Sequence, residues 1–137
     1  MFKEASKAKI EFILKMTNNI KIILERHNGI TKALSDEVEA RPAILMALMQ
    51  IGESLKKIDN NILEKFDLIK DVKGAYDVKN FIAHDYEGVN MVTIENILRV
   101  HIPILENKFL LLLKEFEKLK MECKKDKNAT KINLKEE

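Results

Sequence analysis

Residues 79–86 have the sequence Lys-Asn-Phe-Ile-Ala-His-Asp-Tyr, and the predicted helices and candidate site are worked out from this segment. This segment brings a cation, an amide, an imidazole, a carboxylate and a phenol close together. Residues 75–78 lead into it without a helix breaker, and residues 87–90, Glu-Gly-Val-Asn, are typical of a loop. We therefore predict that the segment ends a helix at His84 and that Tyr86 lies in the loop that follows.

Apolar residues recur at three- and four-residue steps on both sides of this segment, which predicts four long helices. We expect these helices over residues 5–26, 38–58 (starting between 38 and 41), 67–84 and 91–124, with short helical turns at 31–37 and 62–66. Pro42 fits only a first turn, whereas Pro103 must kink or split the last helix. Gly52 would let a neighbouring helix approach closely. The predicted fold is all-α, an up-and-down four-helix bundle with short extra helices.

The apolar stripes of these helices predict the buried faces. The second helix has one regular stripe, formed by Ile44, Leu48, Ile51, Leu55 and Ile58. The third has a less regular one, formed by Leu68, Ile69, Val72, Tyr76, Val78 and Phe81. The fourth combines Ile94, Ile97, Leu98, Ile104, Leu105, Leu112, Phe116 and Leu119.

Composition limits the class of protein. The 137 residues suffice for one helical domain over 1–125, followed by a flexible basic tail over 126–137. The net charge of +2 gives no strong overall attraction to nucleic acid. One cysteine excludes disulfides within the chain and suits a reducing compartment. With no hydrophobic signal core and only short apolar runs, we expect a cytoplasmic protein that does not enter a membrane.

The side chains of residues 79–86 suit chemistry on a phosphate. His84 can exchange a proton near neutral pH, and Lys79 can sit against a phosphate as a point charge. Asn80 and His84 are four residues apart and share a helix face. Lys79 and His84, five apart, are turned by roughly 140° on a regular helix. They therefore share a site only if the helix loosens at its end, or if two copies of the segment meet across a dimer axis.

The same residues carry a family resemblance. Residues 79–86 resemble the R-x-x-x-x-H-x-Y motif of the HEPN superfamily in its HepT-like branch of small helical toxins, which are encoded beside MntA-like minimal nucleotidyltransferases. Residues 41–44 and 51–53 resemble the second-helix pattern of this branch, and residues 85–90 resemble its loop after the histidine. The resemblance covers most of residues 8–120.

The resemblance implies a role for each matching position. His84 corresponds to the catalytic histidine of a metal-independent ribonuclease, and Asn80 to the asparagine after the motif's arginine. Tyr86 corresponds to the tyrosine to which the partner nucleotidyltransferase adds AMP to silence the toxin. Lys79 stands where the family has arginine, so it keeps the charge but loses the planar two-pronged grip on phosphate. We therefore expect a weakened nuclease.

Two carboxylates adjoin this set. We expect Asp85 to support the site without contacting RNA. Glu53 lies next to the stripe of the second helix, where it either pairs with a cation at a helix boundary or supports the Lys79–His84 site.

Three functions remain open. The first is the toxin of a type VII-like toxin–antitoxin pair, a homodimer that pairs its third and fourth helices, cleaves RNA without metal or cofactor, has no DNA specificity and is neutralised at Tyr86. The second is a non-catalytic nucleotide- or partner-binding subunit of a minimal nucleotidyltransferase. The third is a helical scaffold without chemistry.

Overall fold

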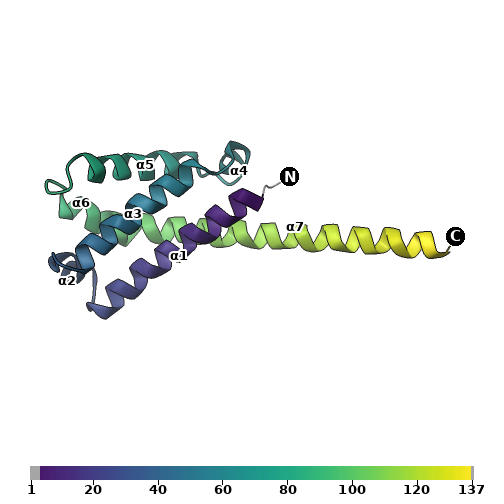
Figure 1. Ribbon diagram of the computed structural model, residues 1–137, viewed down its shortest axis with the longest axis horizontal. Helices are drawn as coiled ribbons and strands as arrows, with labels where there is room; N and C mark the ends of the chain where they lie inside the picture. Colours follow the sequence, from purple (N-terminus) through teal and green to yellow (C-terminus); the bar gives the residue numbers. More distant parts are fainter. Residues whose placement is uncertain (1–3, 137) are drawn as a thin grey trace.

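The computed structural model describes the backbone of residues 4–136 and the side chains of residues 6–122. Its elements are α1 (Glu4–Arg26), α2 (Ile30–Ser35), α3 (Ala40–Lys56), α4 (Asn60–Lys65), α5 (Ile69–His84), α6 (Met91–Asn96), the π-helix η1 (Ile97–His101) and α7 (Ile102–Glu136). No strand occurs over 4–136. Long helices α1, α3, α5 and α7 are separated by short ones (Figure 1), which confirms the predicted all-α bundle.

Helix α3 lies at the centre of the packing. It contacts α1 on one side and α5 on the other, while α1 also packs against α7 (Figure 1). The stripe predicted for this helix is confirmed, since all five of its residues are buried, namely Ile44, Leu48, Ile51, Leu55 and Ile58. Burial of such a stripe removes apolar surface from water and is the main source of stability for the bundle.

The turn between α1 and α2 uses two residues with positive φ. Asn28 has φ 59° and Gly29 has φ 124°, and the Gly29 N–H donates to the Leu24 carbonyl at 2.9 Å. Asparagine and glycine adopt such angles with less strain than other residues. This turn closes the carbonyl end of α1 and starts α2 in a new direction.

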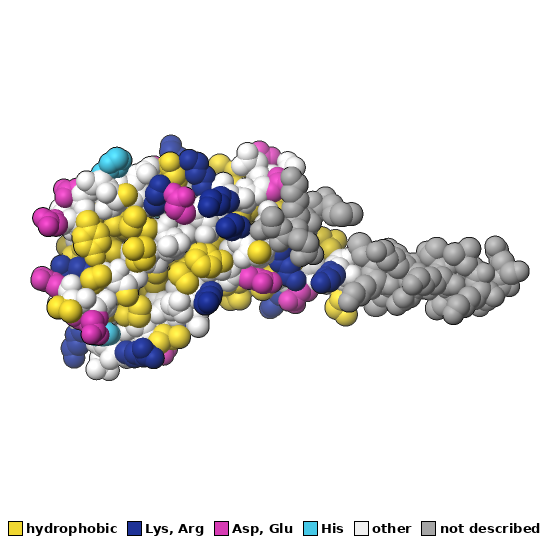
Figure 2. Space-filling model, viewed as in Figure 1, with side chains coloured by type: hydrophobic (Ala, Val, Ile, Leu, Met, Phe, Trp, Pro, Cys, Tyr) yellow, Lys and Arg dark blue, Asp and Glu magenta, His cyan; other side chains and the backbone are white. Residues whose placement is uncertain are grey.

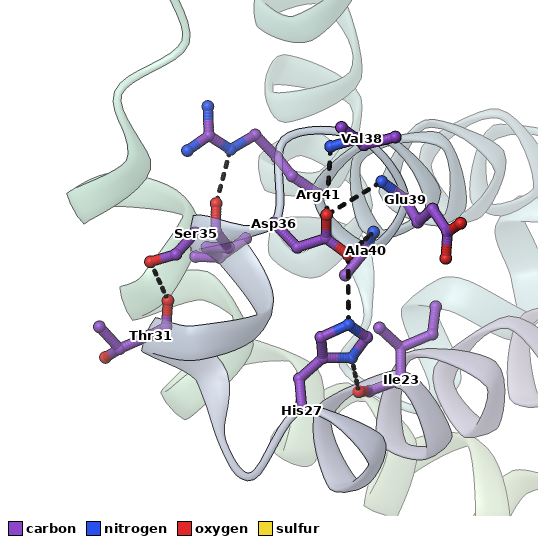
Figure 3. Close-up of polar contacts among 10 residues, drawn as sticks. Ile23, His27, Thr31, Ser35, Asp36, Val38, Glu39, Ala40 and Arg41 are labelled. Atoms are coloured by element: carbon purple, nitrogen blue, oxygen red, sulfur yellow. Dashed lines mark hydrogen bonds and ion pairs between the residues drawn. The ribbon is translucent and has the colours of Figure 1, made fainter.

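Asp36 joins the end of α1 to the start of α3 (Figure 3). Its carboxylate accepts backbone N–H groups from Val38, Glu39 and Ala40 at 3.2, 3.3 and 3.0 Å. These bonds, led by the one from Ala40, lower the pKa of Asp36. The His27 ring bridges the same carboxylate, with Nε2 at 3.2 Å, and the Ile23 carbonyl, with Nδ1 at 2.9 Å.

Arg41 belongs to the same corner (Figure 3), where its Nε donates to the Leu34 carbonyl at 2.6 Å. The residue therefore holds α2 against the first turn of α3. Pro42 follows it in that first turn, where the missing N–H has no consequence.

The predicted break at Pro103 takes the form of a π-helix. Proline cannot donate to the carbonyl four residues earlier, and its ring excludes that carbonyl from a regular turn. The chain forms a π-helical turn over Ile97–His101, where the Ile102 N–H donates to the Ile97 carbonyl five residues back. Pro103 then falls in the first turn of α7.

Helix α7 continues to Glu136, so the predicted end of the last helix at Lys124 is wrong. The expected tail over 126–137 has side chains outside the described residues, and its flexibility stays a prediction. No helix in the part of the chain that is described combines the length and the apolar character needed to span a membrane.

Some residues assigned to the stripes are not buried. Ile104 and Leu119 of α7 are exposed, whereas Phe109, which the predicted stripe omitted, is completely buried. In α5, Ile69 and Phe81 are exposed, and Ile82 is the buried residue of that helix. The reason is that α5 packs mainly on α3, so only a narrow face of it is covered.

Candidate functional site

His84 is the last residue of α5, and its side chain is exposed. The helix stays α-helical through His84, so the first of the two arrangements, a helix that loosens at its end, does not occur in the single chain. On a regular helix Lys79 and His84 project about 140° apart. Of the two arrangements that would unite them, only the meeting of two copies remains.

Tyr76, Asn80 and His84 form a row along one side of α5. They are spaced by four residues, which places them one above the other on a regular α-helix. Asn80 is half-buried, and after Lys56 its side chain is the next largest cause of a lowered pKa for the Tyr76 phenol. The row leads from the middle of α5 to the exposed imidazole at its end.

Gly52 of α3 brings the backbone of α5 close to that of α3. A Cβ on this glycine would lie 2.7 Å from the Ala75 carbonyl oxygen and 2.8 Å from the Cβ of Lys79. Both distances are shorter than any real Cβ contact, so the predicted close approach of a second helix is confirmed. Lys79 is therefore fixed at its base by the glycine of a neighbouring helix.

Lys79 makes an ion pair with Glu53, with Nζ and Oε1 2.5 Å apart. The hydrogen bond between them is the main cause of a lowered pKa for Glu53 and a raised pKa for Lys79. Glu53 thus pairs with a cation that belongs to the predicted site, which is compatible with both roles considered for it. Its part in any reaction stays a prediction.

Tyr76 adds an aromatic ring to the same group. The Nζ atoms of Lys56 and Lys79 lie 4.1 and 5.1 Å from the centre of its ring. Such contacts between an ammonium and a ring face are attractive. Lys56, by hydrogen bonding, is the largest cause of a lowered pKa for the Tyr76 phenol, followed by Asn80.

The loop after the helix is closed by Asp85. Its Oδ1 accepts the Gly88 N–H at 3.0 Å, and the Asp85 carbonyl accepts the same N–H at 3.2 Å. Asp85 therefore shapes the turn that carries Tyr86, rather than pairing with Lys79. Tyr86 is 46 % exposed. The Asn90 side chain then accepts the Val92 N–H at 2.8 Å and starts α6, as predicted.

A cavity of about 330 Å³ lies beside this region, on the other side of α5. Leu48 and Ile51 of α3 line it, as do residues of α5, η1 and α7. Lys70, Asp71 and His101 are its polar lining, and Asp71 is paired with Lys108 at 2.8 Å. His101 thus faces the cavity and belongs to a different helix from the row of His84.

Over the described side chains, no three His, Cys, Asp or Glu residues come together as potential metal ligands. Figure 2 shows basic side chains gathered around an acidic one where α3 and α5 lie side by side. The chemistry that this arrangement offers is that of ammonium groups, a phenol, an amide and a titratable imidazole.

Sequence reasoning missed Lys56 and assigned Tyr76 only to the apolar stripe. Tyr76 precedes Lys79 by three residues and Asn80 by four, which is the spacing of neighbours on a helix. That spacing could have associated it with the motif. The position of Lys56 depends on how α3 and α5 are registered at Gly52, for which the sequence holds no local signal.

Comparison with known proteins agrees with this picture. The family model described as "Ribonuclease HepT-like" matches residues 13–111. A relative from Methanocaldococcus jannaschii, named "Putative RNase MJ0125", is 32 % identical over 77 residues. That alignment covers 55 % of this chain and 64 % of the relative, so the chain spans somewhat less than two-thirds of the relative's length. No solved structure matches the chain.

The matched residues include α3 and α5 together with Glu53, Lys79, Asn80, His84 and Tyr86. This match extends over well more than half of the sequence. The chain therefore belongs to the HepT-like ribonuclease family.

Proposed function

We propose that the protein is a metal-independent RNA endonuclease in which His84 transfers protons at a phosphodiester. The observation that carries this proposal is the exposed imidazole at the end of α5, in a row with Asn80 and Tyr76, and the ring of Tyr76 contacts the ammonium of Lys79, which lies 5.1 Å from the ring centre. The ribose 2′-oxygen attacks phosphorus and gives up its proton to a base. The 5′-oxygen leaves with a proton from an acid, and a 2′,3′-cyclic phosphate remains.

Each residue has a defined part. His84 of one or both copies acts as base or acid, and Lys79 stabilises the negative charge on the crowded phosphate. Asn80 orients the groups that share its face. Because the nucleophile is the 2′-hydroxyl of the substrate itself, DNA is not a substrate.

The proposed active form is a homodimer that pairs α5 and α7 of two copies. Support comes from apolar side chains that the single chain leaves exposed on these helices, including Phe81 at 48 % and Ile104 at 45 %. They lie on α5 and α7, the helices that flank the apolar cavity. Exposed apolar groups around a hollow are typical of a contact surface. Such a pairing would bring two Lys79–Asn80–His84 sets to one cleft.

The decisive experiment is cleavage of single-stranded RNA in the presence of a metal chelator. The native chain should cut, and His84→Ala should lose at least about a hundredfold in rate, the usual range for loss of a general acid or base. His101→Ala is the matched control and should cut at the native rate, provided that sedimentation shows the same oligomer. Full cutting by His84→Ala, or none by the native chain, would rule out the proposal.

Lys79→Arg sharpens the test. Arginine offers two parallel donors to a phosphate, so this variant should cut faster if the cation limits the rate. An equal or lower rate would show that Lys79 does not limit the reaction.

The second candidate function is that of a regulated partner of an MntA-like nucleotidyltransferase. The exposure of Tyr86 on a closed turn favours it, as does the pairing of Lys79 with Glu53, which neutralises the cation. The Tyr86 oxygen would attack the α-phosphorus of ATP and release pyrophosphate. The AMP added would place negative charge next to His84 and silence the protein as the toxin of a toxin–antitoxin pair in the cytoplasm.

Co-expression with a cognate transferase, followed by intact-mass measurement, tests this second function. A mass increase by AMP units that is absent in Tyr86→Phe would support it. Tyr76→Phe is the matched control, because Tyr76 is the other tyrosine of the chain and should leave the modification intact. An unmodified native chain would contradict the proposal.

A further inference from the structure

Lys56 is a second lysine beside the motif, and it comes from another helix than Lys79. It lies in the last turn of α3, whereas Lys79 lies in α5. The two ammonium groups reach the same aromatic ring, at 4.1 and 5.1 Å from its centre. Lys56 is nevertheless exposed, so its remaining N–H groups are open to a ligand.

The surroundings carry an excess of positive charge. Lys56, Lys57 and Lys79 all act on Glu53 and lower its pKa, and Glu53 is the acid that pairs with Lys79. One carboxylate thus faces three ammonium groups. A surface with more ammonium groups than carboxylates attracts an anion. The anion can bind the ammonium groups together with Glu53 or can displace Glu53 from them.

A phosphate group fits two ammonium groups better than one. A lysine is a compact point charge with three rotatable donors, and a single lysine gives no fixed geometry. Two lysines from different helices, both placed by one ring, can donate to two oxygens of the same phosphate. We propose that Lys56 and Lys79 jointly bind a phosphate of the RNA backbone and that Tyr76 is the residue that positions them.

This inference rests on the proposed function, because it assigns the ligand class at the same site. The row of Tyr76, Asn80 and His84 explains how the two parts connect. An RNA strand that lies along this side of α5 would meet the lysine pair of one copy, and the imidazole that acts beside Lys79 would come from the second copy of the proposed dimer.

The test measures binding of a 2′-O-methyl oligoribonucleotide, which lacks the attacking hydroxyl and cannot be cut. Fluorescence anisotropy gives Kd for the native chain, Lys56→Gln and Lys57→Gln over a range of salt concentrations. Lys57→Gln is the matched control, since it removes the same charge from the neighbouring residue, and Lys57 makes no ring contact recorded among the described residues. Lys56→Gln should raise Kd by about tenfold and lower the salt slope by about 0.7, the value for one single-strand phosphate contact.

The outcomes separate clearly. Lys57→Gln should change Kd by less than about threefold. Lys56→Arg should bind with a Kd close to that of the native chain, because a cation is retained at this position. Equal losses for Lys56→Gln and Lys57→Gln, or no binding by the native chain, would overturn the inference.

The positioning role of Tyr76 is tested by substitutions that keep or remove its aromatic ring. Tyr76→Phe keeps the face on which the lysines lie and should bind within about twofold of native, whereas Tyr76→Leu should weaken binding by roughly three- to fivefold. Circular dichroism confirms that both variants remain helical. Equal effects of the two substitutions would show that the ring does not position the lysines.

The inference and the proposed function fail separately. A native chain that cuts RNA but shows no special dependence on Lys56 would refute the lysine pair and leave the nuclease. A chain that does not cut RNA, yet binds the uncleavable strand through Lys56, would refute the nuclease and leave the lysine pair.

Discussion

Helices α3 and α5 are neighbours of similar length, yet they have opposite relations to the core. Nine residues of α3 are buried, whereas Ile82 is the one residue of α5 that is buried. Most side chains of the candidate site follow the reverse order. Lys79, Asn80 and His84 lie on α5 and Tyr86 is the second residue after it, whereas α3 contributes Glu53 and Lys56. Packing is thus concentrated in α3, whereas the polar side chains of the adjacent helix α5 are exposed or half-buried.

The largest effect should come from the core of α3. Leu55→Ala removes a completely buried side chain and should lower the free energy of unfolding by about 2–5 kcal/mol. Ile69→Ala, at an exposed position of α5, should lower it by less than about 1 kcal/mol at low protein concentration. Urea unfolding measures both. Similar losses in the two variants would contradict the contrast between the helices.

The contact between the two helices should give the next effect. Gly52→Ala places a Cβ against the Ala75 carbonyl, which cannot move without α5, and should destabilise the chain by about 1–3 kcal/mol. Gly74→Ala is the matched control, since no atom lies within 4 Å of its added Cβ. That substitution should stabilise the chain by about 0.5–1 kcal/mol, the helix preference of alanine over glycine.

Urea midpoints distinguish these two glycines directly. A neutral Gly52→Ala would mean that α3 and α5 can separate without loss. The pairing of Lys79 with Glu53 would then lose its fixed geometry, and the proposed lysine pair would lose one of its supports.

The smallest effect should be the pH dependence of the Glu53–Lys79 pair. The pKa of Glu53 is lowered, so its contribution to stability is present above its ordinary pKa and is lost as pH falls through the lowered value. The pKa of Lys79 is raised, so its contribution is present below its ordinary pKa and is lost as pH rises through the raised value. The pair therefore stabilises the fold at neutral pH.

Glu53→Gln should reduce the urea midpoint slightly at neutral pH, and the difference from native should vanish in acid, below the pKa of Glu53. Glu87→Gln, an exposed glutamate in the loop after α5, is the control and should show no such pH-dependent difference. A difference that persists in acid would mean that Glu53 acts through packing and not through its charge.

The contrast between the two helices also explains what the sequence could predict. Every residue of the regular stripe predicted for the second helix is buried, because a helix covered from both sides must be apolar at its core positions. The buried face of α3 is wider than the stripe and also includes Leu45 and Ala47. The irregular stripe of α5 misled, since Ile69 and Phe81 are apolar but exposed. Periodicity indicates which residues avoid water on average, and it does not distinguish a buried core face from an exposed apolar face.

The site shows the same limit. Residues close in sequence, such as Asn80 and His84, could be placed on one face from helical spacing alone. The ion pair of Glu53 with Lys79 and the ring contact of Lys56 depend on the register between α3 and α5, which Gly52 fixes. From the sequence, Gly52 could be interpreted as the point where another helix approaches. The sequence did not indicate which helix that would be. Similarly, Pro103 predicted a break in the last helix, but the sequence did not indicate that a π-helical turn would accommodate the proline.

The turn closed by Asp85 and Gly88 bears on the proposed addition of AMP to Tyr86. A Cβ on Gly88 would lie 2.1 Å from Oδ2 of Asp85, so the carboxylate fills the space that a side chain would take. The phenol thus lies on a preformed bend, and under the proposed modification the transferase would have little chain entropy to remove on docking. Substituting alanine for Gly88 would displace the carboxylate and open the bend, and it should slow any transfer to Tyr86 without touching the tyrosine itself.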